Sequence, residues 1–263
     1  MPSSSPALLF LDFDGVMCDS EAECFASSWL TWQETLHPPA ATAVALRLRE
    51  RFSDLRPLIR SGEDYLVIQH LLREEERSGR RFPANQDAFD GMQDQLGGDR
   101  IGEFKRALAD TRARFLAEHR QHWLALNPLY VHVRELLLRY DLAGVRILST
   151  KAPALIGEIL SANSIDLPAQ AVLHAASKPG ATDVRKLDLM ADELRRSGRS
   201  RALFVEDQVG HLLGADSSDV GLYLCDWGYA LPEALARTEW LRERQITVLS
   251  AGDLEDLFRQ TGA

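Results

Sequence analysis

The sequence predicts an α/β protein with a doubly wound, mainly parallel, Rossmann-like sheet and an inserted all-helical domain. Two observations support this prediction. From residue 127 onward, short apolar runs alternate with helical patterns, which is typical of parallel sheets with right-handed crossovers. One earlier apolar run, at residues 7–13, is followed by roughly a hundred residues that show only helical periodicity.

Six short apolar runs are predicted to be the strands of the sheet. They lie at residues 7–13, 145–149, 171–175, 201–207, 220–225 and 246–250. Helical patterns separate the later strands. The first opens at Asn127-Pro128, and the others lie at residues 153–162, 182–197, 208–215, 232–244 and 253–260.

The inserted domain is predicted to span residues 20–126, which leaves 1–19 and 127–263 as the α/β core. Apolar residues in the insertion recur at helical spacing, as at Tyr65, Ile68 and Leu72. Helix breakers divide it into about five or six helices. These breakers are His37-Pro38-Pro39, Pro57, Ser61-Gly62, Ser78-Gly79, Pro83 and Gly97-Gly98.

Composition excludes several classes of protein. The net charge of -9 and the sequence pI of about 5.3 argue against nucleic acid as a partner. No apolar run approaches the roughly 18 residues of a membrane span, and the N-terminus lacks the pattern of a signal peptide. Three cysteines, Cys18, Cys24 and Cys225, form no metal-ligand or disulfide pattern. We therefore expect a cytoplasmic protein with reduced thiols.

Chemically reactive side chains follow four of the predicted strands. They are Asp12 and Asp14, Ser149-Thr150-Lys151, Ser177-Lys178-Pro179, and Glu206-Asp207. Because ligands bind at the carboxyl ends of parallel strands, these groups are expected to converge on one edge of the sheet. A two-residue period places the first two acids on the same side of an extended chain.

The segments DFDGVMCDS, ILSTK, SKPG and FVEDQVGH resemble the four motifs of the haloacid dehalogenase-like (HAD) hydrolases. The resemblance is to the branch with a helical cap inserted after the first strand, which includes phosphoglycolate phosphatase and β-phosphoglucomutase. The DWGY segment resembles a turn common in that branch. The likeness covers both pieces of the core, whereas the insertion resembles a cap only in its position and helical content.

The resemblance implies roles for the two acids of the first motif. Asp12 would be the nucleophile that forms an aspartyl-phosphate. Asp14 would protonate the departing alkoxide and then activate a water molecule. A halide leaves without a proton whereas an alkoxide needs one, so Asp14 favours phosphate esters over haloacids as substrates.

The resemblance also implies a phosphate-binding set. Ser149, with Thr150 as an alternative, would donate a hydrogen bond to a phosphoryl oxygen. Lys178 would neutralise charge on the nucleophile and the transition state, because it lies in a Lys-Pro setting typical of the third motif. Lys151 and Lys186 are the alternatives for that lysine.

A phosphate can approach these acids only if a cation screens the repulsion, and oxygen ligands of this kind suit Mg²⁺. The implied ligands are the Asp12 carboxylate, the Asp14 main-chain carbonyl and Asp207, with Glu206 as a further contributor. Many relatives carry another acid where this chain has His211. That difference leaves open whether metal binding is weaker here.

The leading hypothesis is therefore a Mg²⁺-dependent phosphatase that hydrolyses a small phosphorylated metabolite. A phosphomutase with the same site, or a non-catalytic binding or regulatory module, is the alternative, and a dehalogenase comes last. Arg56 and Arg60, four residues apart in the cap, are a candidate clamp for a second anionic group on the substrate, although a solvent-facing helix also explains them. The substrate, and the choice between monomer and homodimer, stay open.

Overall fold

The structure is a computed structural model that describes residues 6–35, 42–175, 186–213 and 219–262. The chain divides into two units. The core unit runs to Asp19 and resumes at Pro128, and the cap unit runs from Ser20 to Asn127.

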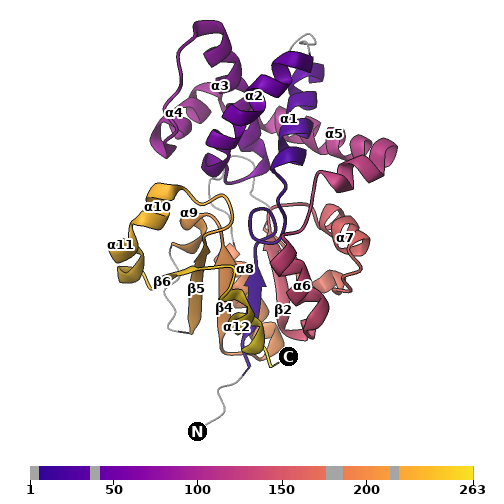
Figure 1. The fold of residues 1–263 in the computed structure, drawn as a ribbon, viewed down its shortest axis with the longest axis vertical. Helices are drawn as coiled ribbons and strands as arrows, with labels where there is room; N and C mark the ends of the chain where they lie inside the picture. The colour runs from indigo at the N-terminus through magenta and orange to yellow at the C-terminus, as the bar shows by residue number, and fades with distance from the viewer. Residues whose placement is uncertain (1–5, 36–41, 176–185, 214–218, 263) are drawn as a thin grey trace. The chain divides into compact units, whose positions relative to one another are not determined.

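The core unit contains a six-stranded parallel sheet (Figure 1). The strands are β1 (Leu8–Leu11), β2 (Val145–Ser149), β3 (Val172–His174), β4 (Ala202–Glu206), β5 (Val220–Cys225) and β6 (Ile246–Leu249). Their order in the sheet is β3-β2-β1-β4-β5-β6. The predicted α/β class with a doubly wound parallel sheet is confirmed.

Strand β1 lies in the middle of the sheet, between β2 and β4. Leu11 is paired with Ile147 on one side and with Val205 on the other. The strand order reverses between β1 and β4, so the carboxyl ends of these strands flank the switch point where such sheets bind ligands. The Asp12 amide continues the ladder by donating to the Val205 carbonyl at 3.0 Å.

Helices connect the strands of the core unit. They are α6 (Val131–Arg139), α7 (Pro153–Ala162), α8 (Lys186–Ser197), α9 (Val209–Leu212), α10 (Pro232–Ala236), α11 (Thr238–Glu243) and α12 (Leu254–Arg259), with 3₁₀ turns at Leu142–Gly144 and Ala169–Ala171. Buried Phe10 and Phe204 of the sheet form one core cluster with Met190 of α8 and Leu241 of α11. Burial of large side chains of this kind is the main stabilising term for the sheet.

One predicted helix of the core is divided in two. The segment 232–244 has a continuous helical pattern, but Arg237 has the non-helical angles φ -83° and ψ 50° and separates α10 from α11. The periodicity therefore identified the element without detecting the break inside it.

All the regular elements that the structure describes in the cap unit are helices. Its helices are α1 (Glu21–Thr35), α2 (Thr42–Leu55), α3 (Tyr65–Ser78), α4 (Gln86–Leu96) and α5 (Gly98–Ala125), with 3₁₀ turns at Arg56–Leu58 and Gly62–Asp64. Large side chains fill its interior. The most completely buried include Trp32, Phe52, Phe89, Phe104 and Trp123.

The local sequence explains where the cap helices end. Gly79 follows α3 in the left-handed conformation, with φ 68°, which glycine adopts without steric cost. The Asn85 side chain caps α4 by accepting the Ala88 amide at 2.9 Å. Across the described residues, no helix combines the length and the apolar character that crossing a bilayer requires.

Candidate active site

Three carboxylates meet where β1 and β4 end. Asp12 directly follows β1, Glu206 is the last residue of β4, and Asp207 comes next. Each offers an oxygen, and these three oxygens lie within 4.8 Å of one another. All three residues are buried, so their mutual repulsion is poorly screened by water. The arrangement follows from the pairing of β1 with β4, which sets Asp12 beside Glu206.

Lys186, the first residue of α8, supplies a cation to this cluster. Its Nζ lies 2.6 Å from Glu206 Oε2 and 3.0 Å from Asp12 Oδ1, and its side chain is only 2% exposed. The contact with Glu206 is a hydrogen bond. The contact with Asp12 is an ion pair without hydrogen-bond alignment, so this buried Asp12 oxygen accepts no hydrogen bond from the described residues.

The surroundings change the acidity of these groups in opposite directions. Burial, and then the charge of Glu206, raises the pKa of Asp12 from 3.8 to about 6, although Lys186 opposes the shift. Burial would also raise the pKa of Glu206, but Lys186 and then His211 outweigh it and lower that pKa strongly. Lys186 thus favours the charged form of Glu206 more strongly than that of Asp12.

Glycines allow the loops around Asp207 to approach closely. Gly15 has φ +90°, and a Cβ there would lie 2.2 Å from Asp207 Oδ2. A Cβ on Gly228 would lie 2.2 Å from the Gly15 carbonyl oxygen. The Tyr229 amide donates to Asp207 Oδ2 at 3.1 Å. The turn that contains Gly228 and Tyr229 therefore fixes the Asp207 carboxylate, and only glycine fits at the two close approaches.

Asp14 has its own cation. Lys151 Nζ donates to Asp14 Oδ1 at 3.0 Å, and the Lys151 side chain is 1% exposed. The backbone of Lys151 is tied to the end of β2, because its amide donates to Ser149 Oγ at 3.3 Å. Ser149 is buried, whereas Thr150 is partly exposed.

His211 lies beside the cluster without being part of it. It belongs to α9, and its Nδ1 is 3.2 Å from Glu206 Oε1. The group of candidate metal ligands within 4.8 Å of one another consists, among the described residues, of Asp12, Glu206 and Asp207 and does not include His211. The imidazole therefore contacts the site through Glu206.

Three further predicted site residues lie elsewhere or are not described. Lys178 falls outside the described residues, so its assigned role stays a prediction. Arg56 is 4% exposed, with its guanidinium carbon 5.7 Å from the centre of the Tyr65 ring. Arg60 forms hydrogen bonds with Asp90 and with Gln93. Whether Arg56 and Arg60 bind substrate also stays a prediction.

Some contacts of the site were not anticipated from the sequence. Lys186 was an alternative to Lys178, but nothing in its local sequence indicated that it would reach both Asp12 and Glu206. The close approach of Gly15 to Asp207 was also missed. The glycine that directly follows Asp14 in the first motif was the available signal, since glycine often marks such approaches.

The buried carboxylates form a candidate cation site. Among the described residues, Asp12, Glu206 and Asp207 each offer an oxygen within 4.8 Å of the others, and Lys186 contacts Asp12 and Glu206. The donors are all oxygens, and one buried Asp12 oxygen accepts no hydrogen bond there, so these residues fit a hard cation such as Mg²⁺.

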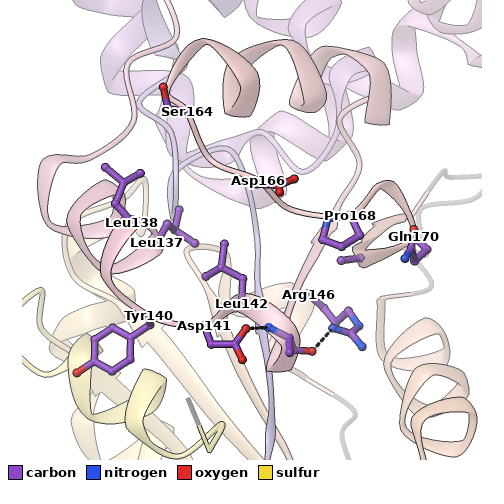
Figure 2. A pocket seen from close by; sticks show the side chains of 12 residues that line it. Leu137, Leu138, Tyr140, Asp141, Leu142, Arg146, Ser164, Asp166, Pro168 and Gln170 are labelled. Atoms are coloured by element: carbon purple, nitrogen blue, oxygen red, sulfur yellow. Dashed lines mark hydrogen bonds between the residues drawn. The ribbon is translucent and has the colours of Figure 1, made fainter.

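A hollow of about 590 Å³ lies on another part of the core unit (Figure 2). Its lining includes residues of the turn that precedes β2, at the amino end of that strand and therefore away from the strand ends that hold the carboxylates. Asp141 accepts the Ala143 amide, and Arg146 donates to the Ala143 carbonyl. These polar groups hold the turn in place, and the hollow is separate from the candidate active site.

No protein-family model and no curated protein matches this sequence. Solved structures do match it over nearly the whole chain. Several of these structures are named as HAD-like hydrolases or phosphatases, so the resemblance noted in the sequence is confirmed at the level of the fold.

Three similar structures illustrate this likeness. A HAD-like family hydrolase from Streptococcus pneumoniae is 16% identical, with a TM-score of 0.54, and the match covers 96% of this chain and 97% of that one. A predicted phosphoglycolate phosphatase from Haemophilus somnus is 17% identical (TM-score 0.59; coverage 98% and 99%). Protein Tyrosine Kinase A from Mycobacterium tuberculosis is 18% identical (TM-score 0.56; coverage 99% and 100%). The proteins that share this fold are thus named as hydrolases in two cases and as a kinase in the third.

Proposed function

We propose that this protein is a Mg²⁺-dependent phosphatase that hydrolyses a small phosphorylated metabolite through an aspartyl-phosphate at Asp12. The observation that supports the proposal most directly is the cluster of Asp12, Glu206 and Asp207 oxygens within 4.8 Å, with Lys186 Nζ 3.0 Å from Asp12. The names of two structural neighbours, a hydrolase and a phosphoglycolate phosphatase, point to the same chemistry.

In the first step, an Asp12 oxygen attacks phosphorus while the bond from phosphorus to the ester oxygen breaks. Protonated Asp14 gives its proton to that oxygen, so the alcohol leaves neutral and Asp14 becomes a carboxylate. Lys186 offsets the negative charge near Asp12, and the Ser149 hydroxyl, with Thr150 as the alternative, would donate to a phosphoryl oxygen.

In the second step, the Asp14 carboxylate takes a proton from a water molecule as the water oxygen attacks phosphorus. The bond between phosphorus and Asp12 breaks, which releases inorganic phosphate and restores both acids. Asp14 thus acts as an acid and then as a base, and no proton is gained or lost by the protein over the cycle.

A divalent cation, when bound, would supply positive charge that allows a phosphate to approach the acids. The Asp12 and Asp207 carboxylates and the Asp14 main-chain carbonyl are the proposed ligands. Glu206 would contribute mainly by holding Lys186, because its oxygens already contact Lys186 and the Gln208 amide. Tyr229 would keep Asp207 oriented through its amide.

The proposal is tested by measuring phosphate release from phosphorylated sugars, nucleotides and phosphoglycolate, with and without Mg²⁺. We expect release from at least one compound that requires the metal and falls on the order of 10³-fold or more in Asp12→Asn. Lys105→Met is a matched control, since Lys105 pairs with Glu63 in the cap unit and its side chain is 41% exposed.

Two other results would point to different functions. Low phosphate release that coincides with isomerisation of a sugar phosphate, in the presence of a bisphosphate activator, would indicate a phosphomutase. Absence of release from every compound by folded native protein, with Mg²⁺ present, would contradict the phosphatase and favour a binding module.

A further inference from the structure

Lys151 is a buried ammonium group that the reaction steps above do not use. Its side chain is 1% exposed, and its Nζ lies 5.8 Å from the centre of the Phe13 ring. Removing an ammonium group from water costs several kcal/mol unless it is paired and hydrogen-bonded. This ammonium donates a hydrogen bond to Asp14 Oδ1 at 3.0 Å.

The backbones on both sides of this contact are fixed. Lys151 follows Ser149 at the end of β2, and its amide donates to the Ser149 hydroxyl oxygen. Asp14 lies in the loop after β1, where the Gly15 amide donates to the Cys18 carbonyl at 2.9 Å and residues 14 and 18 form a β-bridge. The direction of the Asp14 carboxylate therefore depends on its side-chain torsions and on Lys151.

Each of the two buried lysines contacts a different acid of the first motif. Lys186 contacts Asp12 and Glu206, whereas Lys151 contacts Asp14. They come from different parts of the chain, at the start of α8 and after β2. Each proposed catalytic acid thus has its own cation, and the loss of one lysine should affect one acid more than the other.

We propose that Lys151 is a positioning residue that holds the Asp14 carboxylate in the orientation required for proton transfer. The inference rests on the proposed phosphatase function. A misoriented general acid or base loses most of its effect, because proton transfer requires hydrogen-bond distance to the ester oxygen or the water. Lys151 acts through Asp14, so its contribution disappears when Asp14 is already inactive.

A double-mutant cycle on an alkyl phosphate substrate tests this dependence. We expect Lys151→Met to lower kcat about 100-fold while KM changes less than about 3-fold, and Lys151→Arg to recover part of the loss. Asp14→Asn alone and Asp14→Asn combined with Lys151→Met should have equal kcat within about 3-fold. Lys105→Met should keep native kinetics. Additive losses in the double variant would overturn the proposal.

4-Nitrophenyl phosphate separates the two proton transfers, because nitrophenolate leaves without a proton. Its release from Lys151→Met should show a burst of one equivalent per enzyme followed by slow turnover, since only the water-activating step still needs Asp14. A slowed first step with a raised KM would instead mean that Lys151 binds the phosphate directly, and would overturn the positioning role.

The failure of this inference differs from the failure of the proposed function. If folded native protein with Mg²⁺ releases phosphate from neither ester and from no compound of the screen, the phosphatase proposal fails and this inference fails with it. If native protein is active but Lys151→Met keeps native kcat on the alkyl ester, only the inference fails. Should Lys151→Met not fold, as judged by circular dichroism, Lys151→Gln replaces it in the same cycle with the same criteria.

Discussion

The core and cap units both bury charged side chains, but the two sets differ in how their carboxylates are grouped. In the cap unit, Glu23 is fully buried and faces Arg112, whose Nε and Nη2 donate to it at 2.8 and 2.9 Å. Ser27 donates a further hydrogen bond to Glu23 at 2.6 Å. One anion thus meets one cation, with hydrogen bonds on both carboxylate oxygens.

The core unit instead gathers several carboxylates. Among the described residues, oxygens of Asp12, Glu206 and Asp207 lie within 4.8 Å of one another, and one Asp12 oxygen accepts no hydrogen bond. A complete ion pair is explained by packing alone, whereas neighbouring buried carboxylates require a cation or a raised pKa. The gathering of the carboxylates, rather than their burial, therefore distinguishes the candidate active site.

Removal of Lys186 should have the largest effect, because it leaves Asp12 and Glu206 buried beside each other. We expect Lys186→Met to lower the free energy of unfolding by about 3–5 kcal/mol in metal-free buffer and to abolish phosphate release. Urea denaturation at pH 7 measures the first effect. Lys105→Met, which removes a half-exposed pair, should cost less than about 1 kcal/mol. A loss at Lys186 as small as that of this control would contradict its role as a cation of the carboxylate cluster.

Breaking the ion pair of the cap should destabilise the protein without affecting the metal. Glu23→Gln leaves Arg112 buried beside a neutral partner, and we expect a loss of about 3 kcal/mol. The rise in the thermal unfolding midpoint caused by Mg²⁺ should equal that of the native protein. The double variant Glu23→Leu with Arg112→Leu should recover part of the loss. A reduced response to Mg²⁺ in Glu23→Gln would show that the pair belongs to the active site.

Asp64 should give the cap a pH dependence. Burial raises the pKa of Asp64 from 3.8 to about 6, against its hydrogen bonds from the Arg60 and Ser61 amides. The folded protein then holds a proton that the unfolded chain has lost, so this contribution is complete below about pH 4 and is lost as pH rises through about 6. At most about 3 kcal/mol is involved.

Asp64→Asn isolates the pH-dependent contribution of Asp64 to the free energy of unfolding, because the amide does not titrate while Asp12 and the other acids still do. The difference in unfolding free energy between native protein and variant should change between pH 4 and pH 6 and be constant above about pH 7. A difference that does not vary with pH would show that the pKa of Asp64 is not raised.

Two glycines with positive φ give the smallest expected effects. Gly79 in the cap has φ 68°, and a Cβ there would meet nothing within 4 Å, so Gly79→Ala should cost about 1 kcal/mol from backbone strain alone. Gly15→Ala adds a clash with Asp207 at 2.2 Å and should also weaken Mg²⁺ binding. Calorimetric titration of Mg²⁺ measures the second effect, and equal metal affinity in both variants would contradict it.

The fold was largely predictable because strand and helix periodicities differ. Six apolar runs became the six strands, and the described breakers lie at or near the ends of the cap helices. The break at Arg237 was not predictable, because it interrupts a continuous helical pattern. Long periodic elements are defined by many residues at once, whereas a single turn depends on local angles that the pattern does not contain.

The meeting of Asp12 with Glu206 and Asp207 could be predicted from the strand ends. The contact of Lys186 with Asp12 could not be predicted, because it depends on where α8 begins and on how a long flexible side chain is oriented. The Lys-Pro setting favoured Lys178, which lies outside the described residues, whereas Lys186 begins α8 and reaches Asp12. The contact of Lys151 with Asp14 also depends on a side-chain conformation that the sequence does not specify.

The most direct measurement of whether Asp12 accepts a phosphoryl group needs no knowledge of the substrate. Trifluoroberyllate binds carboxylates as a mimic of an aspartyl-phosphate, and ¹⁹F NMR detects its bound form. With Mg²⁺ present, phosphoryl transfer to Asp12 predicts bound resonances for native protein, and none for Asp12→Asn or for native protein without the metal. Bound resonances that persist in folded Asp12→Asn, or their absence from native protein with Mg²⁺, would contradict it.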